Sequence, residues 1–99
     1  MDIRLEYIGK TLVVKLYGEL DQSCASDIRE KIDKEITLHS MKNLVMDFNN
    51  VEFMDSSGIG LIMGRYKLMK FLKGSLELVN VPQRIDRLIK LSGLYILKR

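Results

Sequence analysis

The run Leu-Val-Met-Asp-Phe at residues 44–48 constrains the fold of this 99-residue chain more than any other segment. It is short and almost wholly apolar, which is typical of a central strand covered on both faces, as in parallel sheets. Asn49 and Asn50 follow, and we expect the strand to end there. Parallel strands are joined by helices that cross over the sheet, so this run favours an α/β fold.

The segment before this run predicts a hairpin and a helix. Residues 3–7 and 12–17 alternate apolar and polar side chains around a Gly-Lys turn, which predicts two antiparallel strands, the second ending at residues 18–21. Apolar residues then recur at every fourth position and predict an amphipathic helix over about residues 23–38. Its buried stripe consists of Cys24, Ile28, Ile32 and Ile36.

The segment after the run continues the alternation. We expect a helix over about residues 57–72, a strand at 76–79, a helix between Pro82 and Gly93, and a closing strand at 94–97. The chain therefore predicts one domain, residues 1–99, with a mostly parallel sheet, an N-terminal antiparallel hairpin and helices packed on it. With 46% apolar residues the chain has enough to fill one core.

The cysteine content and the N-terminus predict a cytoplasmic protein without a membrane partner. Cys24 is the only cysteine, so no internal disulfide forms. The first residues lack the apolar segment of a secretion signal, and no run approaches the roughly 18 apolar residues that span a bilayer.

The charge is unevenly distributed along the chain. Residues 1–64 contain 7 Lys/Arg and 11 Asp/Glu, whereas residues 65–99 contain 9 Lys/Arg and 2 Asp/Glu. A basic C-terminal third suits nucleic acid or an acidic partner, but no nucleic-acid-binding motif accompanies it. Solvated helix faces explain the same charges, so we expect no nucleic-acid partner.

The helix expected at residues 57–72 has two apolar rows. One row should pack on the sheet and consists of Ile59, Ile62, Met63, Tyr66 and Met69. The nearly opposite row consists of Leu61, Leu68 and Leu72. Either neighbouring helices cover these leucines or another protein docks on them. Gly60 and Gly64 each cost roughly 1 kcal/mol in a helix, which favours a close approach to that backbone by a partner or by a neighbouring helix.

The loop at residues 55–58, Asp-Ser-Ser-Gly, lies between a strand and a helix, where ligands of parallel sheets collect. Free N–H groups at the helix start favour an anion, including a phosphate on Ser56 or Ser57. Asp21 ends an earlier strand, so a parallel sheet brings it to the same edge as Asp55. These residues are also good helix N-caps, and from the local pattern alone capping is the simpler explanation.

Catalytic motifs are missing around this loop. It is not a Gly-x-Ser-x-Gly nucleophile elbow, and the only histidine is His39, at the end of a helix. The chain has no phosphate-binding loop of the NTPases, and two aspartates are a weak signal for Mg²⁺. We therefore expect neither a catalytic residue nor a metal or other cofactor. The alternative is a metal-dependent phosphoacceptor or enzyme that uses Asp21 and Asp55.

Residues 53–67 closely resemble the signature of the anti-sigma factor antagonists, the STAS-domain family. Their sequence is Phe-Met-Asp-Ser-Ser-Gly-Ile-Gly-Leu-Ile-Met-Gly-Arg-Tyr-Lys. Within that family they are most similar to the antagonists of anti-sigma-F factors, which act in sporulation. Two shorter stretches agree in order, Gly-Glu-Leu-Asp at 18–21 and Leu-Ser-Gly-Leu at 91–94. The resemblance thus extends over essentially the whole chain.

The resemblance implies a cytoplasmic regulator of transcription that binds an anti-sigma factor and so frees a sigma factor. The anti-sigma factor is also a serine kinase, which phosphorylates the serine that matches Ser56 and thereby ends binding. A metal-dependent serine phosphatase restores the binding form. Asp21 then lines the phosphorylation site with Asp55, Ser57 and Gly58. The chain is the substrate of this chemistry and not an enzyme.

The resemblance fits a simple charge mechanism. A phosphate adds about −1.5 to −2 charges where Asp55, and Asp21 beside it, are already negative, so like charges meet a partner-facing surface. Four residues that adjoin the switch become candidates for partner binding, namely Gly60, Leu61, Gly64 and Leu68. An antagonist that acts in a sigma system outside sporulation would have a similar loop.

Overall fold

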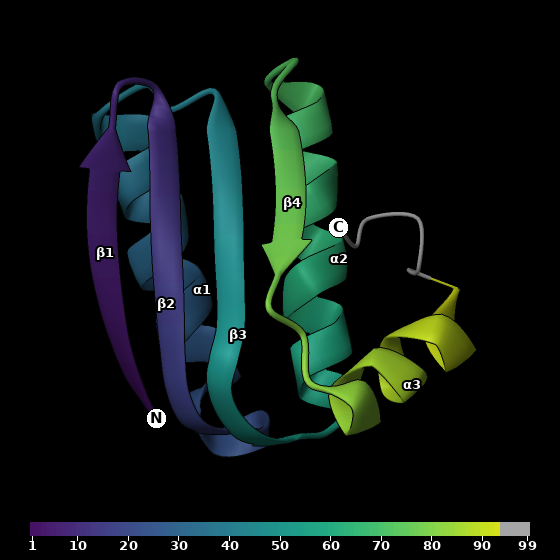
Figure 1. Ribbon diagram of the computed structural model, residues 1–99. Coiled ribbons are helices and arrows are strands. Elements are labelled where there is room, and N and C mark those ends of the chain that lie inside the picture. Colours follow the sequence, from purple (N-terminus) through teal and green to yellow (C-terminus); the bar gives the residue numbers. More distant parts are fainter. Residues whose placement is uncertain (94–99) are drawn as a thin grey trace.

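Strands and helices alternate along the chain after an initial pair of strands (Figure 1). The computed structural model describes residues 1–93. Its elements are β1 (Asp2–Ile8), β2 (Thr11–Leu20), α1 (Gln22–Leu38), β3 (Asn43–Met54), α2 (Ser56–Phe71), β4 (Ser75–Val79) and α3 (Gln83–Ser92). This confirms the α/β class, the hairpin and all three helices. The strand expected at 94–97 lies outside the described residues.

The four described strands lie in the order β1-β2-β3-β4. β1 and β2 are antiparallel, whereas β2–β3 and β3–β4 are parallel and are joined through α1 and α2. Gly9 has a φ of +58°, a conformation that suits glycine in the tight turn of the hairpin. The carboxyl ends of β2 and β3 therefore lie side by side, and each leads directly into a helix.

β3 is longer than expected, and the prediction that it ends at Asn49 and Asn50 is wrong. In the pairing with β2, Asp47 lies opposite Lys15 and Asn50 opposite Tyr17, so β3 contains one extra residue there. A second shift follows a few residues later. Such bulges insert a residue without ending a strand. β2 ends at Leu20, within the expected range of residues 18–21, and Leu20 pairs with Met54.

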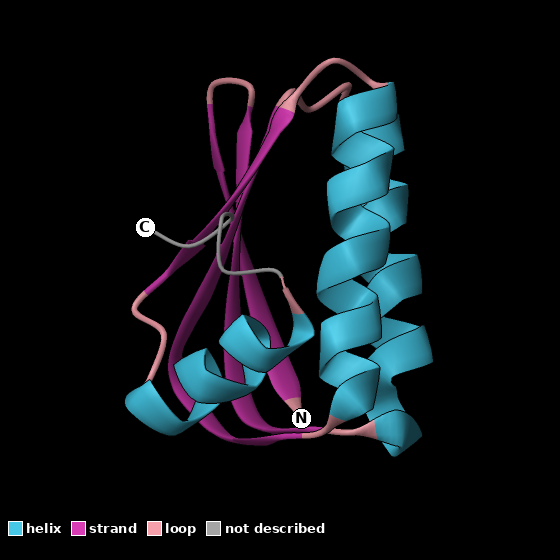
Figure 2. Ribbon diagram, turned by 90° about the vertical axis from the view of Figure 1, so that its right-hand side faces the viewer, coloured by secondary structure: helices cyan, strands magenta, loops and turns pink. Residues whose placement is uncertain are grey.

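The two long helices cover one face of the sheet (Figure 2). Leu44, Met46 and Phe48 point to this face and are fully buried. Val45 and Asp47 point to the other face and are only half-buried. Within residues 1–93 no helix covers that second face, so the expectation of a strand covered on both faces is wrong there. α3 lies beyond the edge of β4 (Figure 1).

An ion pair between Asp33 and Arg65 joins α1 to α2. Arg65 is only 6% exposed, and its Nε lies 2.9 Å from Asp33 Oδ1 without the alignment of a hydrogen bond. Burial raises the pKa of Asp33, and the Arg65 guanidinium opposes that rise. Burial likewise lowers the pKa of Arg65. The pair therefore adds an electrostatic contact between α1 and α2.

Among residues 1–93, no helix has both the length and the apolar character that crossing a bilayer requires.

Candidate functional site

The carboxyl ends of β2 and β3 bring two aspartates together, as the parallel sheet predicted. Asp21 follows β2 and Asp55 follows β3, and both line one open hollow of about 440 Å³ with Gln22 and Ser23. The backbone N–H of Asp55 donates to the Leu20 carbonyl at 3.2 Å. This bond ties the two strand ends to each other and holds both aspartates at one edge of the sheet.

Asp21 caps the start of α1. Its Oδ1 accepts hydrogen bonds from the Ser23 backbone N–H at 3.0 Å and from the Ser23 hydroxyl at 2.6 Å. These bonds stabilise the carboxylate and lower the pKa of Asp21 below its ordinary value of 3.8. Asp21 is therefore a fixed negative charge at physiological pH, and its capping role is confirmed.

Asp55 caps α2 in the same way. Its Oδ1 accepts the Ser57 backbone N–H at 2.8 Å, and its carbonyl accepts the Gly58 N–H at 3.0 Å. Gly58 is buried, and a Cβ there would overlap the Met54 side chain. Capping and close packing therefore account for three of the four residues in the Asp-Ser-Ser-Gly loop.

Ser56 is the member of the loop that capping and packing do not use. It is the first residue of α2 and is exposed, whereas Ser57 is half-buried. In the described part of the chain no hydrogen bond engages the Ser56 hydroxyl, while the Ser23 hydroxyl of the matching turn is bonded to Asp21. Ser56 thus presents a free hydroxyl at a helix N-terminus, on the edge where two carboxylates lie.

The same edge offers oxygen ligands to a cation, but few of them. Asp21 and Asp55 are the carboxylates that line the hollow. Residues 1–93 hold no cluster of three or more His, Cys, Asp or Glu side chains that suits a metal ion. A site with two carboxylates binds Mg²⁺ only with additional oxygens from water or phosphate.

A groove of about 330 Å³ runs between α1 and α2, beginning one turn beyond the loop. Its lining consists of Ala25, Ser26, Arg29, Gly60, Leu61, Gly64 and Arg65. A Cβ at Gly60 or Gly64 would meet nothing within 4 Å. Within the described chain, close helix packing therefore does not explain these two glycines, and their surface is open to a partner.

The second apolar row of α2 is not a free docking face. Leu61 is only 4% exposed, and Leu68 and Leu72 are half-buried against the core. The alternative in which neighbouring elements cover the leucines is therefore correct, because α1 packs beside α2. Leu61 is buried but borders the groove, and its expected role in partner binding stays a prediction.

Sequence reasoning missed Arg65 and Arg29 as parts of this surface. A charged residue in the middle of an apolar helix is normally assigned to the solvated face. A signal for Arg65 was available, because Gly64 immediately precedes it and Gly60 lies one turn earlier, and these glycines mark the open surface of the helix. Arg29 had no such signal, because its position depends on how α1 packs against α2.

These features describe a small α/β binding module with an accessible serine at the edge of its sheet. A family model described as the STAS domain matches residues 2–97. The chain is 36% identical over 95 residues to "Anti-sigma F factor antagonist" of Paenibacillus polymyxa, covering 96% of this chain and 81% of the relative. It is 35% identical over 82 residues to "Anti-sigma-B factor antagonist" of Bacillus subtilis (strain 168), covering 82% of this chain and 72% of the relative. The chain belongs to the STAS-domain family.

Solved structures agree with this assignment. The anti-sigma factor antagonist SpoIIAA in its unphosphorylated form matches with a TM-score of 0.91 at 31% identity, covering 99% of this chain and 86% of that one. The Bacillus cell fate determinant SpoIIAA in the phosphorylated form matches with a TM-score of 0.82, again at 31% identity, covering 99% of this chain and 89% of that one.

Proposed function

We propose that this protein is an anti-sigma factor antagonist whose binding is switched off by phosphorylation of Ser56. The unphosphorylated form binds an anti-sigma factor that is also a serine kinase, and the bound anti-sigma factor releases its sigma factor. Relatives named as antagonists and the SpoIIAA structures in two phosphorylation states support this function. In this scheme the protein is the kinase's substrate, and a metal-dependent serine phosphatase regenerates the binding form.

The observation that carries the proposal is the free hydroxyl of Ser56. A kinase needs an acceptor that reaches its nucleotide, and Ser56 is exposed at the first position of α2. Ser57, the neighbouring candidate, is half-buried, and its N–H is held by Asp55. This contrast favours Ser56 as the acceptor over Ser57.

Charge provides the switch. A phosphate on Ser56 adds about −1.5 to −2 charges beside Asp55 and Asp21. The start of α2 offsets part of this charge within the domain, because helix N-termini favour anions. A partner surface that docks across the loop gains no such compensation. One desolvated like-charge contact costs about 3 kcal/mol, more than a hundredfold in Kd.

The groove between α1 and α2 is the second part of the proposed interface. It begins one turn from Ser56, and the backbone at Gly60 and Gly64 is open. We expect the anti-sigma factor to pack against these glycines, with Leu61 and Leu68 supporting them from the core. A partner element that fits here is narrow and approaches the α2 backbone closely.

We propose that the sigma factor controlled by this protein is the sporulation factor sigma F. The relative at 36% identity is named for sigma F, and a relative at 35% identity is named for sigma B. The first match covers 96% of this chain and the second 82%. We therefore propose an anti-sigma-F factor as the partner, and the binding assay below is run with anti-sigma factors of both kinds.

Binding of a charge-mimicking variant tests the proposal. Ser56→Asp should keep its circular dichroism spectrum and melting temperature but bind the anti-sigma factor at least tenfold more weakly than wild type, and Ser56→Ala should bind like wild type. Ser40→Asp is the matched control, because Ser40 is exposed after the end of α1, away from the loop, and Asp tolerates its φ of +51°. If Ser56→Asp binds as tightly as wild type, the charge mechanism is wrong.

A further inference from the structure

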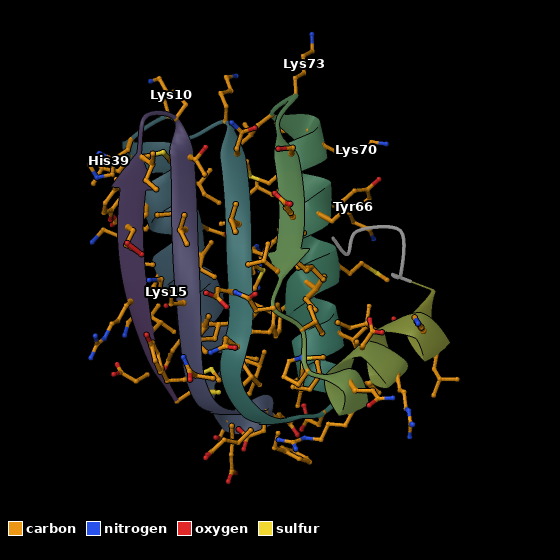
Figure 3. All side chains as sticks on the ribbon, in the orientation of Figure 1. Lys10, Lys15, His39, Tyr66, Lys70 and Lys73 are labelled. Atoms are coloured by element: carbon orange, nitrogen blue, oxygen red, sulfur yellow. The ribbon has the colours of Figure 1, made fainter. Side chains whose placement is uncertain are left out.

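The end of the molecule opposite the Ser56 loop combines lysines with exposed apolar side chains. Figure 3 shows Lys10, Lys70, Lys73 and His39 toward this end. We call it the lysine-rich end and define it by two sets of residues. The cationic set is Lys10, Lys42, Lys70 and Lys73, and the apolar set is Ile8, Leu38 and Phe71.

Backbone hydrogen bonds hold the turns of the lysine-rich end together. The N–H groups of Lys42 and Asn43 donate to the Lys10 carbonyl at 2.9 and 3.0 Å. The Ser75 N–H donates to the Lys42 carbonyl at 3.0 Å, and a Cβ at Gly74 would overlap that carbonyl. Three turns from distant parts of the sequence therefore form one continuous surface that holds Lys10, Lys42 and the residues beside Lys73.

These turns contain no acidic residue. Residues 9–11, 39–43 and 72–75 include three lysines and one histidine and neither Asp nor Glu. The Glu35 carboxylate near this end is engaged by the Tyr7 hydroxyl and by His39, whose Nε2 lies 3.3 Å away. The lysine-rich end is therefore positively charged, in contrast to the loop edge with Asp21 and Asp55.

Part of this charge has a structural role. Lys42 Nζ donates to the Leu72 carbonyl at 3.2 Å and so satisfies the end of α2. Lys70 lies in the last turn of α2, where cations stabilise a helix. Lys10 is on the hairpin turn and has no helix end of its own to stabilise. Stabilisation of helix ends therefore explains the positions of Lys42 and Lys70 but not that of Lys10.

The apolar set is unexplained by the fold. Phe71 is 82% exposed, and Ile8 and Leu38 are each 65% exposed. They come from the ends of α2, β1 and α1, so three separate elements each present one large apolar side chain. The T-shaped contact between the rings of Tyr7 and His39, with centroids 5.2 Å apart, places the ends of β1 and α1 next to each other.

We propose that the lysine-rich end binds the surface of an anionic phospholipid bilayer. Lysines gain from the negative potential of such a surface, and projecting apolar side chains enter the boundary between headgroups and acyl chains. Side chains that project outward suit a flat surface better than they suit a peptide, which needs a groove. Ser56 is 15 residues from Phe71 along α2, about 22 Å at the helical rise. Bilayer binding therefore leaves the loop free, and the proposal does not depend on the anti-sigma function.

Sedimentation with lipid vesicles tests this proposal. The probes are vesicles of phosphatidylcholine alone and vesicles with about 30% phosphatidylglycerol, each at low and high salt. Wild type should sediment with the anionic vesicles at low salt, and high salt should release it. Lys10→Gln with Lys73→Gln should weaken binding about 25-fold, about fivefold for each lysine. Phe71→Ala should weaken it further without lowering the melting temperature.

A matched variant separates local from overall charge. Lys67→Gln with Arg87→Gln removes the same net charge from exposed positions outside the lysine-rich end, and it should bind like wild type to within about threefold. Equal loss in both double variants, equal binding to neutral vesicles, or no binding to anionic vesicles would each overturn the proposal. Preference for an acidic polypeptide or a nucleic acid over the anionic vesicles would overturn it as well.

Discussion

Replacing Gly64 with alanine should separate the stability of the domain from its binding. Gly64 lies inside α2, and a Cβ there meets nothing within 4 Å. Glycine in a helix interior costs about 1 kcal/mol relative to alanine, mostly through backbone entropy. Gly64→Ala should therefore raise the free energy of unfolding by about 1 kcal/mol, which corresponds to about 4–8 °C in Tm for a domain of this size.

The same methyl group should weaken binding to the anti-sigma factor. It narrows the groove where we expect the partner to contact the α2 backbone. Urea denaturation measures the first effect, and calorimetric titration of the anti-sigma factor measures the second. Gly93→Ala is the matched control, because its φ of +86° makes alanine strained there and should lower stability. If Gly64→Ala stabilises the fold and binds like wild type, the groove is not part of the interface.

Three further perturbations test the packing and the electrostatics. Gly58→Ala should destabilise the fold by about 1–2 kcal/mol in urea denaturation, because its Cβ overlaps Met54, and an unchanged midpoint would contradict that packing. Asp33→Ala leaves Arg65 unpaired and should lower the free energy of unfolding by about 2 kcal/mol, less than for a fully buried pair because Asp33 is about one-third exposed. In the Arg65→Met background the same substitution should cost less, because no charge is then left unpaired. The lowered pKa of Asp21 means that its carboxylate stabilises the fold above the ordinary value of 3.8 and that this contribution is lost as the pH falls through the lowered pKa. The stability gap between wild type and Asp21→Asn should therefore narrow as the pH falls below 3.8 and close once the pH has passed through the lowered pKa, and a gap that is independent of pH would refute this assignment.

The sequence predicted most of the fold because its strongest signals are local. The period of four in α1 places Ile28, Ile32 and Ile36 on one face, and all three are buried. The convergence of Asp21 and Asp55 followed from parallel pairing, since parallel strands end at the same edge. Both inferences need only the period of an element and the direction of its neighbour.

The errors came from features that depend on contacts between elements. The bulges in β3 keep Asn49 and Asn50 within the strand, although such residues usually mark a turn. Arg65, which sequence reasoning missed, is buried and lies beside Asp33 of α1. No local pattern contains this information, because each case depends on a partner that is distant in the sequence.

The central claim is that Ser56 accepts a phosphate from the anti-sigma factor, and intact-mass spectrometry tests it most directly. The protein is incubated with a candidate anti-sigma-F factor and Mg-ATP, beside the Ser56→Ala variant and in parallel with an anti-sigma-B factor. We predict one added phosphate in wild type, stable to hydroxylamine, and none in the variant. A phosphate that hydroxylamine removes would instead indicate an acyl phosphate on an aspartate. Equal phosphorylation of wild type and Ser56→Ala, or a complex that forms with no phosphate transferred to wild type, would contradict the proposed switch.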